Sequence, residues 1–318
     1  MVRLFLPSDR KLLDYEDRVY ILRPLFFIVR KRSLFILRRM VMKKSIPYLF
    51  LMPGIVLLLL FLMMPLVSIL WPTIFPDGFS LSSYLTFFQD EYYMEILLRT
   101  VRISVIATIV CVILGVPTAY FISRCSAKWK GILIAISIFP MLTNSVVRSF
   151  AWINILGKNG VINNILLSLG VIKEPIAMLY TEFSVLIGTI YLFLPIMIMT
   201  LVGVMDGIDN DMMEAAESLG ASKLKSFVKV VLPLSIPGII TGAVLVFTGS
   251  LTAYTTPQLL GGSKSLVLST LIYQKAMSLN DWAGASVIAF IMIIITLVVM
   301  KVLNMIAARL DKRGEVNA

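Results

Sequence analysis

Long apolar runs, separated by shorter polar stretches, dominate the pattern of hydrophobic and polar positions along this chain. A helix needs about 20 mostly apolar residues to cross the hydrocarbon core of a bilayer. Six runs reach that length, so we predict an all-α membrane protein with six transmembrane helices. The expected spans are 46–70, 100–122, 131–147, 183–205, 236–254 and 283–307.

The composition agrees with this pattern. Of 318 residues, 58% are hydrophobic and 15% are charged, which is too apolar for a soluble domain of this length. The net charge of +11 would suit nucleic acid, but the basic residues gather at the ends of apolar runs and so indicate membrane topology. The expected partner is therefore the lipid bilayer and not nucleic acid. With two cysteines and no histidine, neither a disulfide framework nor a metal site is expected.

The basic residues also orient the spans. Residues 1–46 hold twelve Lys or Arg against four Asp or Glu, and Arg124, Lys128 and Lys130 follow the second span. Cytoplasmic loops carry an excess of Lys and Arg, and an even number of spans puts both chain ends on one side. We therefore predict a multi-pass inner-membrane protein with both termini and the loop 124–130 in the cytoplasm.

Three segments are expected. Residues 1–45 form a basic cytoplasmic or interfacial segment, in which 19–42 alternate apolar pairs with Arg and Lys. That stretch carries too many charges to span, and we expect a helix lying on the inner membrane surface. Residues 46–310 form the six-span domain, and 311–318 form a cytoplasmic tail.

The polar loop 209–237 lies between the fourth and fifth spans and reads DNDMMEAAESLGASKLKSFVKVVLPLSIP. Asp211 and Glu214 have the spacing of a capping box at the start of a short helix. Gly220 suits the left-handed conformation that follows a helix end. The first half of the loop is therefore predicted to be a short helix and a sharp turn.

A second helix is expected over 223–231, capped by Ser222 and ended by Pro233, which disfavours helix at Leu232. Its residues Leu224, Phe227, Val228 and Val231 would share one face. Capping and periodicity alone favour an ordinary amphipathic helical hairpin on a membrane surface.

The full spacing of the loop favours a more specific interpretation. It resembles the cytoplasmic EAA loop of permease subunits from binding-protein-dependent ABC importers, whose pattern is Glu-Ala-Ala, three residues, Gly, nine residues, Ile, one residue and Leu-Pro. The only departure here is Val230 in place of Ile. The residues expected to couple to the ATPase are Glu214, Ala215, Ala216, Leu219, Gly220, Ala221, Leu232 and Pro233.

This resemblance implies the type I ABC importer permease fold, in which the helix-turn-helix coupling loop docks into the ATP-hydrolysing subunit. It implies three partners, namely a second permease subunit, an ATPase subunit dimer and an extracytoplasmic substrate-binding protein. The chain has no Gly-rich phosphate loop ending in Gly-Lys-Ser/Thr and no placed nucleophile and base. We therefore expect no catalytic residue and no cofactor in this chain, with ATP and Mg in the partner ATPase.

Three further segments, 139–148, 152–164 and 253–262, look like those of polyamine permeases. With the loop, they make the stretch 46–310 similar to the first of the two permease subunits of spermidine/putrescine importers. Related permeases for ferric ion, thiamine or an aminophosphonate share much of the scaffold, so those ligands stay open. The candidate substrate-path residues are Asn144, Arg148, Trp152, Tyr191, Tyr254 and Thr255.

Four of the path residues have a second interpretation. Asn144 and Arg148 are four apart and would lie on one helical face at the outer end of the third span. Polar groups in a span default to a functional role, but Arg148 also suits a snorkelling anchor. Trp152 and the two tyrosines also suit an interfacial aromatic belt.

The path residues constrain the ligand. Aromatic faces attract ammonium groups by roughly 0.5–2 kcal/mol each, which suits a polyamine. The spans hold no central carboxylate, so acidic groups would come from partners or from Glu182 and Asp281 at span ends. Arg148 would repel a cation unless it is paired or turned away, which keeps an anionic aminophosphonate open.

Two other classes of protein are considered. An ion-coupled secondary transporter usually carries ionisable residues within its spans, and this sequence has no Asp, Glu or Lys near the middle of any span. A membrane scaffold would not transport at all. Transport that stops when a partner ATPase is inactivated would exclude both.

Overall fold

The structure is a computed structural model that describes residues 51–75 and 80–310. The chain divides into two compact units, Met1–Ser68 and Ile69–Ala318. The expected surface helix over 19–42 and the tail 311–318 lie outside the described residues, so both stay predictions.

The described residues fold into helices, with no strand among them. Five helices are long and apolar enough to cross a membrane: Leu51–Ile74, Glu91–Ser123, Glu182–Asp206, Lys223–Thr252 and Trp282–Ile306. A pair of helices, Ala127–Leu142 and Ser145–Ser168, makes a sixth span if the two are taken as one span bent by 93°. The all-α class is confirmed, with five or six candidate spans, and the expected third span is broken.

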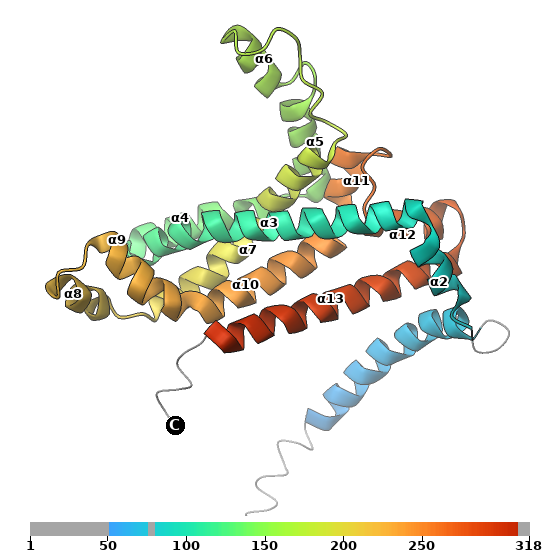
Figure 1. Ribbon diagram of the computed structural model, residues 1–318, viewed down its shortest axis with the longest axis horizontal. Helices are drawn as coiled ribbons and strands as arrows, with labels where there is room; N and C mark the ends of the chain where they lie inside the picture. Colours follow the sequence, from blue (N-terminus) through green and yellow to red (C-terminus); the bar gives the residue numbers. More distant parts are fainter. Residues whose placement is uncertain (1–50, 76–79, 311–318) are drawn as a thin grey trace, which may run out of the picture. The chain divides into compact units, whose positions relative to one another are not determined.

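The centre of the bundle consists of three long helices that pack against one another. These are α3 (Glu91–Ser123), α7 (Glu182–Asp206) and α10 (Leu232–Thr252). A fourth helix, α13 (Trp282–Leu310), packs against α10. Figure 1 shows these helices running side by side. Buried side chains such as Met197, Leu201 and Val246 fill the space between them.

The contact between α10 and α7 depends on small residues. Gly238, Gly242 and Gly249 have the spacing that predicts a close helix pair, and a Cβ added at any of them would come within 3.0 Å of a side chain of α7. The predicted close contact is confirmed.

Several span ends differ from the prediction. The first helix continues to Ile74 rather than ending at 70, and α3 begins at Glu91 rather than near 100. Asp90 caps α3 by accepting a hydrogen bond from the Tyr92 N–H at 2.9 Å. Helix α3 runs through Glu95, whose carboxylate pairs with Arg99 one turn further along the helix.

The third span departs most from the prediction. Helix α4 (Ala127–Leu142) stops at Leu142 instead of 147, and α5 (Ser145–Leu156) starts after a two-residue break. The next helix is α6 (Val161–Ser168). An asparagine cap at the break, described below, explains why the apolar run does not continue as one helix.

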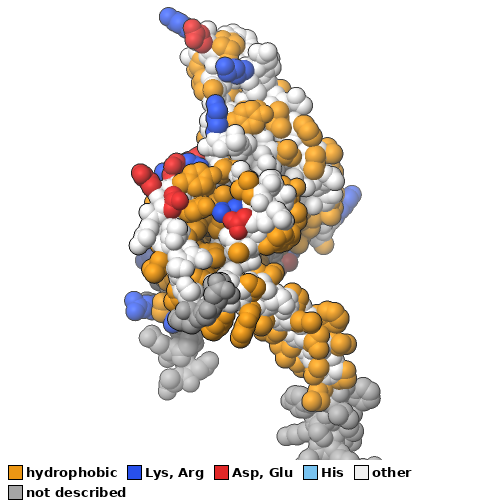
Figure 2. Space-filling view, turned by 90° about the vertical axis from the view of Figure 1, so that its right-hand side faces the viewer, with side chains coloured by type: hydrophobic (Ala, Val, Ile, Leu, Met, Phe, Trp, Pro, Cys, Tyr) orange, Lys and Arg blue, Asp and Glu red, His pale blue; other side chains and the backbone are white. Residues whose placement is uncertain are grey.

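Short elements lie at the two ends of the bundle. The helices α8 (Asn210–Ser218) and α9 (Lys223–Ser226) lie at one end in Figure 1, with α2 (Ser82–Gln89) and α12 (Leu268–Tyr273) at the other. Between α10 and α12 the chain also forms α11 (Thr255–Gly261). Hydrophobic side chains cover much of the surface seen in Figure 2, as expected for helices that face lipid or other subunits.

Candidate functional site

The first helix of the loop, α8, begins at a different cap from the one predicted. Asp209 is the N-cap, and its carboxylate accepts a hydrogen bond from the Asp211 N–H at 3.3 Å. The predicted capping box between Asp211 and Glu214 is therefore wrong. Two acidic residues two positions apart both suit a helix start, and the structure uses the earlier one. Glu214 is exposed and does not serve the cap.

The turn after α8 is the predicted one. Gly220 has a φ of +87°, in the region where a side chain causes strain. The Ala221 N–H donates to the Ala216 carbonyl at 3.1 Å and the Gly220 N–H donates to the Glu217 carbonyl at 2.9 Å. These two bonds are those of a Schellman motif, which closes a helix end. The glycine therefore fixes the direction in which the chain leaves α8.

The second helix starts as predicted but does not stop. The Ser222 hydroxyl caps it by accepting from the Lys225 N–H, and after α9 the chain passes through a π-helical segment, η1 (Phe227–Val231), into α10 without a break. The prediction that Pro233 ends the helix is wrong. Pro233 lies in the first turn of α10, where proline is tolerated, and the wider π turn before it accommodates the missing N–H. The second helix of the loop and the fifth span are one element, Lys223–Thr252.

The loop exposes apolar side chains. Leu219 is 90% exposed and Leu224 is 73% exposed, and Met212 and Val228 are exposed beside them. The four residues predicted to share one face of the second helix do not share one environment. Leu224 and Val228 are exposed, whereas Val231 is buried and Phe227 packs against Tyr120. Exposed leucines on a polar loop outside the spans mark a surface for contact with another protein.

A tyrosine and an arginine of α3 hold the loop against the bundle. The Arg124 guanidinium donates to the Ile208 carbonyl at 3.1 Å and to the Asn210 side chain, just before and at the start of α8. The Tyr120 hydroxyl contacts the Met213 sulfur at 3.0 Å, and the Tyr120 ring lies 4.7 Å from that of Phe227. Both halves of the loop are thus tied to α3.

Sequence reasoning missed these two residues. The charge distribution uses Arg124 to orient the spans, and Tyr120 lies within the expected second span. The signal that was available is the combination of an aromatic and a basic residue four apart at the end of a span, which places both on one helix face.

The break in the third span explains Asn144 and Arg148. The Asn144 side chain caps α5 by accepting from the Val146 and Val147 N–H groups at 2.8 and 3.4 Å. Arg148 is 8% exposed, and it donates to the carbonyls of Pro140 and Thr143 at 2.6 and 3.4 Å. Arg148 therefore helps to satisfy the carbonyls at the end of α4, together with the Thr143 hydroxyl, which donates to Pro140 at 2.8 Å. Asn144 and Arg148 do lie one turn apart, since the Arg148 N–H donates to the Asn144 carbonyl at 3.0 Å, but they do so at the start of α5 and not within a continuous third span. Arg148 is buried and does not reach outward as a snorkelling anchor would.

The aromatic path residues form two pairs. Trp152 and Tyr191 meet edge to face with centroids 5.5 Å apart, and Tyr254 stacks at a tilt on Tyr273 at 4.7 Å. Burial and the neighbouring Tyr273 both raise the pKa of Tyr254, so the phenol is neutral at physiological pH. Sequence reasoning did not select Tyr273, because only the fold brings α12 back to Tyr254.

Helix α11, which Thr255 begins, packs against both α5 and α7. The elements that carry the two aromatic pairs are therefore neighbours at the same end of the bundle.

The two carboxylates at span ends are already engaged. Glu182 binds Arg99 at 3.1 Å and also pairs with Arg102, both on α3. Asp281 accepts from the Lys275 ammonium at 2.8 Å and from the Gly284 N–H at 2.8 Å. Each carboxylate therefore already has a cationic partner within the subunit.

Comparison with known proteins places these features in context. A family model described as "Binding-protein-dependent transport system inner membrane component" matches residues 111–315. The spermidine/putrescine transport system permease protein PotB of Escherichia coli strain K12 is 37% identical over 204 residues, which cover 64% of this chain and 74% of PotB.

Solved structures show a similar fold. The crystal structure of a bacterial ABC transporter involved in the import of the acidic polysaccharide alginate matches with a TM-score of 0.72 at 19% identity, over 85% of this chain and 98% of that one. A structure of the alginate transporter in complex with its pentasaccharide-bound periplasmic protein matches with a TM-score of 0.72 at 20% identity, over 85% and 96%.

Proposed function

The chain belongs to the family of binding-protein-dependent transport system inner membrane components, and from that premise we propose that it forms half of the translocation path of an ATP-driven polyamine importer. The second permease subunit forms the other half. An ATPase subunit dimer supplies the energy, and an extracytoplasmic binding protein delivers the cargo. The observation that carries the transport role is the exposed helix-turn-helix loop whose second helix is continuous with a span.

The loop transmits the motion of the ATPase. Leu219 and Leu224 enter apolar contacts on the ATPase, while Glu214 makes a polar contact from the exposed side of α8. Ala215 and Ala216 beside it leave room for close approach, and the remaining coupling residues, Gly220, Ala221, Leu232 and Pro233, set the turn and the exit into α10. When the dimer closes, the rigid element Lys223–Thr252 carries the displacement into the fifth span.

The distribution of basic residues supports a cytoplasmic position for this loop, for both termini and for the loop 124–130. The test is labelling from outside of single cysteines introduced after Cys111 and Cys125 have been replaced. A cysteine at position 222 should stay protected until the membrane is permeabilised, and strong external labelling there would overturn the topology.

The aromatic pairs support a polyamine as the cargo. Tyr254 with Tyr273 and Trp152 with Tyr191 offer π faces for ammonium groups, and Thr255 adds a hydroxyl. Arg148 is turned to carbonyls of the helix break, so the argument that favoured an anionic ligand loses its support. The similarity to PotB supports the same cargo.

The deciding experiment is uptake of labelled spermidine into vesicles that hold the full complex. We expect saturable, ATP-dependent uptake that putrescine inhibits and that stops when the ATPase is inactivated. Uptake that persists without ATP would contradict the importer mechanism. ATP-dependent transport that a phosphonate inhibits and spermidine does not would contradict the cargo alone.

A further inference from the structure

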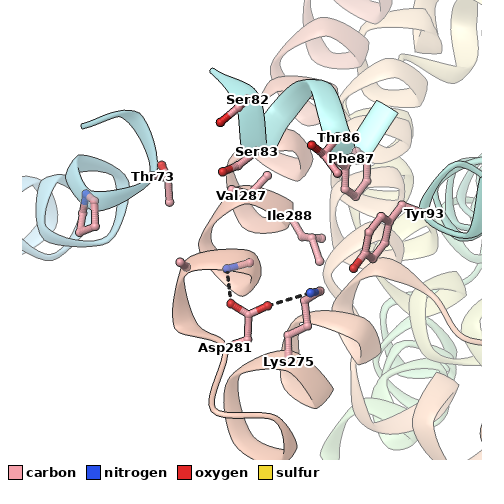
Figure 3. A pocket seen from close by; sticks show the side chains of 13 residues that line it. Thr73, Ser82, Ser83, Thr86, Phe87, Tyr93, Lys275, Asp281, Val287 and Ile288 are labelled. Atoms are coloured by element: carbon pink, nitrogen blue, oxygen red, sulfur yellow. Dashed lines mark hydrogen bonds and ion pairs between the residues drawn. The ribbon is translucent and has the colours of Figure 1, made fainter. Parts of the chain in front are cut away.

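A cavity of about 400 Å³ opens at the end of the bundle opposite the coupling loop. Its walls come from the end of the first helix, from α2, from the first turn of α3, and from a π-helical segment, η2 (Gln274–Ser278), with the start of α13. Figure 3 shows Lys275 and Asp281 pointing toward each other in this cavity, with Tyr93 beside the lysine. The volume is that of a small-molecule site, and the proposed transport path does not use it.

Two tryptophans mark the level of the cavity in the membrane. Trp71 is 60% exposed and precedes the lining residue Pro72, while Trp282 is 57% exposed and follows the lining residue Asp281. Exposed tryptophans at span ends sit at the headgroup level of a bilayer. The mouth of the cavity is therefore at the interface between lipid and water.

The rim carries one positive and one negative charge. The Lys275 ammonium donates to the Asp281 carboxylate at 2.8 Å and lies 5.3 Å from the Tyr93 ring centroid. An ammonium has three donors, and a carboxylate has about four acceptor positions. Asp281 also accepts from Gly284, so both groups keep hydrogen-bonding capacity for a ligand. Hydroxyls at the rim come from Ser82, Ser83 and Thr86.

Both groups are charged at neutral pH. The hydrogen bond from Lys275 and then that from the Gly284 N–H hold the pKa of Asp281 below its ordinary value. Burial alone would lower the pKa of Lys275, but Asp281 and Tyr93 outweigh it and the pKa is raised.

The floor of the cavity is apolar. Phe87, Val287 and Ile288 line it and are buried in the core. The two α13 residues lie about 8 Å further along the helix than Trp282, from the rise of about 1.5 Å per residue. The polar rim of the cavity thus lies at the depth of the lipid headgroups, and its apolar floor lies at the depth of the acyl chains.

We propose that this cavity binds the headgroup of phosphatidylethanolamine. The phosphate accepts from Lys275 and from the hydroxyls of Ser83 and Thr86, and the primary ammonium donates to Asp281. The glycerol and first methylenes lie on the apolar floor. Phosphatidylcholine has the phosphate but no N–H donor, and phosphatidylglycerol has no cation, so the site distinguishes the three lipids.

The test uses the full purified complex, delipidated and then offered equal amounts of the three lipids, with bound lipid counted by native mass spectrometry. We expect phosphatidylethanolamine to be retained over phosphatidylcholine by about tenfold, which corresponds to about 1.4 kcal/mol. The double variant Lys275→Gln with Asp281→Asn removes both charges without leaving either unpaired, and it should abolish the preference. Ser83→Leu fills the cavity and should lower the bound count without altering the ion pair.

The matched control is Lys264→Gln with Glu174→Gln, which removes the same charges from exposed loop positions outside the cavity. It should retain the lipid preference. Equal retention of all three lipids by the parental complex would overturn the proposal, and so would a preference that survives both cavity variants. Spermidine retained in place of lipid, and lost in the double variant, would also overturn it and assign the cavity to the cargo.

Discussion

The two ends of the helical bundle differ in which side chains they expose and which they pair. At the coupling loop, apolar side chains such as Leu219 and Leu224 stand exposed. At the opposite end, charged side chains are paired within the subunit, as in Arg99 with Glu182 and Lys275 with Asp281. The short helices there bury residues such as Leu268 completely.

This difference distinguishes side chains that are available for contact with another protein from side chains that stabilise the subunit itself. Exposed leucines are unfavourable in water and gain free energy only when another protein covers them. A paired charge needs a new partner less than an unpaired one does, because the existing ion pair already compensates for its loss of water. The loop end is therefore suited to contact with another protein, while the opposite end is held together by contacts within the chain.

The largest expected effect is at the turn of the coupling loop. Gly220→Val places a β-branched side chain at a φ of +87°, which costs roughly 1–2 kcal/mol and misdirects the second coupling helix. We expect uptake to fall at least about tenfold, a change equivalent to about 1.4 kcal/mol, while the protein still inserts. Spermidine uptake and ATP hydrolysis are measured in the reconstituted complex.

A matched control exists outside the loop, in the segment that follows α6. Gly170 also has a positive φ, +67°, and open space around it, so Gly170→Val carries similar strain away from the loop. It should lower thermal stability to a comparable degree and leave uptake close to parental. Equal losses of uptake in the two variants would show that strain alone, rather than coupling, explains the effect at Gly220.

The comparison also explains what the sequence could predict. The turn at Gly220 and the cap at Ser222 depend on residues within a few positions of each other, so local pattern was sufficient. The pairing of Tyr254 with Tyr273, and that of Glu182 with two arginines of α3, join distant parts of the chain. No periodicity encodes such contacts. Continuation of the helix through Pro233 was missed because a π turn compensates for the proline.

A smaller effect is expected from the arginines at the two ends of α3. Arg124→Gln removes the guanidinium that holds Ile208 and Asn210, so the loop loses its orientation. We expect the number of substrate molecules transported per ATP hydrolysed to fall about three- to tenfold, equivalent to about 0.7–1.4 kcal/mol. Thermal stability should change little, since the residue is partly exposed.

The counterpart, Arg99→Gln, should show the reverse. Arg99 contacts Glu182 at 3.1 Å and the Leu266 carbonyl at 3.2 Å, and hydrogen bonds to charged groups stabilise by about 1.5–3 kcal/mol each. The melting temperature should drop while transport per ATP stays parental. If Arg99→Gln uncouples and Arg124→Gln only destabilises, the assignment of the two ends is reversed.

The aromatic pairs are expected to give a still smaller effect. Tyr254→Ala removes a π face worth roughly 0.5–2 kcal/mol to an ammonium, so the KM for spermidine should rise severalfold with little change in the maximal rate. Tyr254→Phe keeps the face and is the control, with a KM near the parental value. A KM raised equally by both substitutions would assign the role to the hydroxyl instead.

The smallest effect concerns the pH dependence of the Lys275–Asp281 pair. The pKa of Asp281 lies below its ordinary value of 3.8, so its contribution to stability is present above that value and is lost as pH falls through the lower folded pKa. The pKa of Lys275 lies above 10.5, so its contribution is present below that value and is lost as pH rises through the higher folded pKa. The melting temperatures of the parental protein and of Lys275→Gln with Asp281→Asn should therefore differ by a constant amount between about pH 5 and 9. Because Asp281 is partly exposed, solvent screening limits the corresponding difference in the free energy of unfolding to below about 1 kcal/mol. A difference that changes within this range would mean that another titrating group shares the pair, and that this end of the bundle is less self-contained than its contacts indicate.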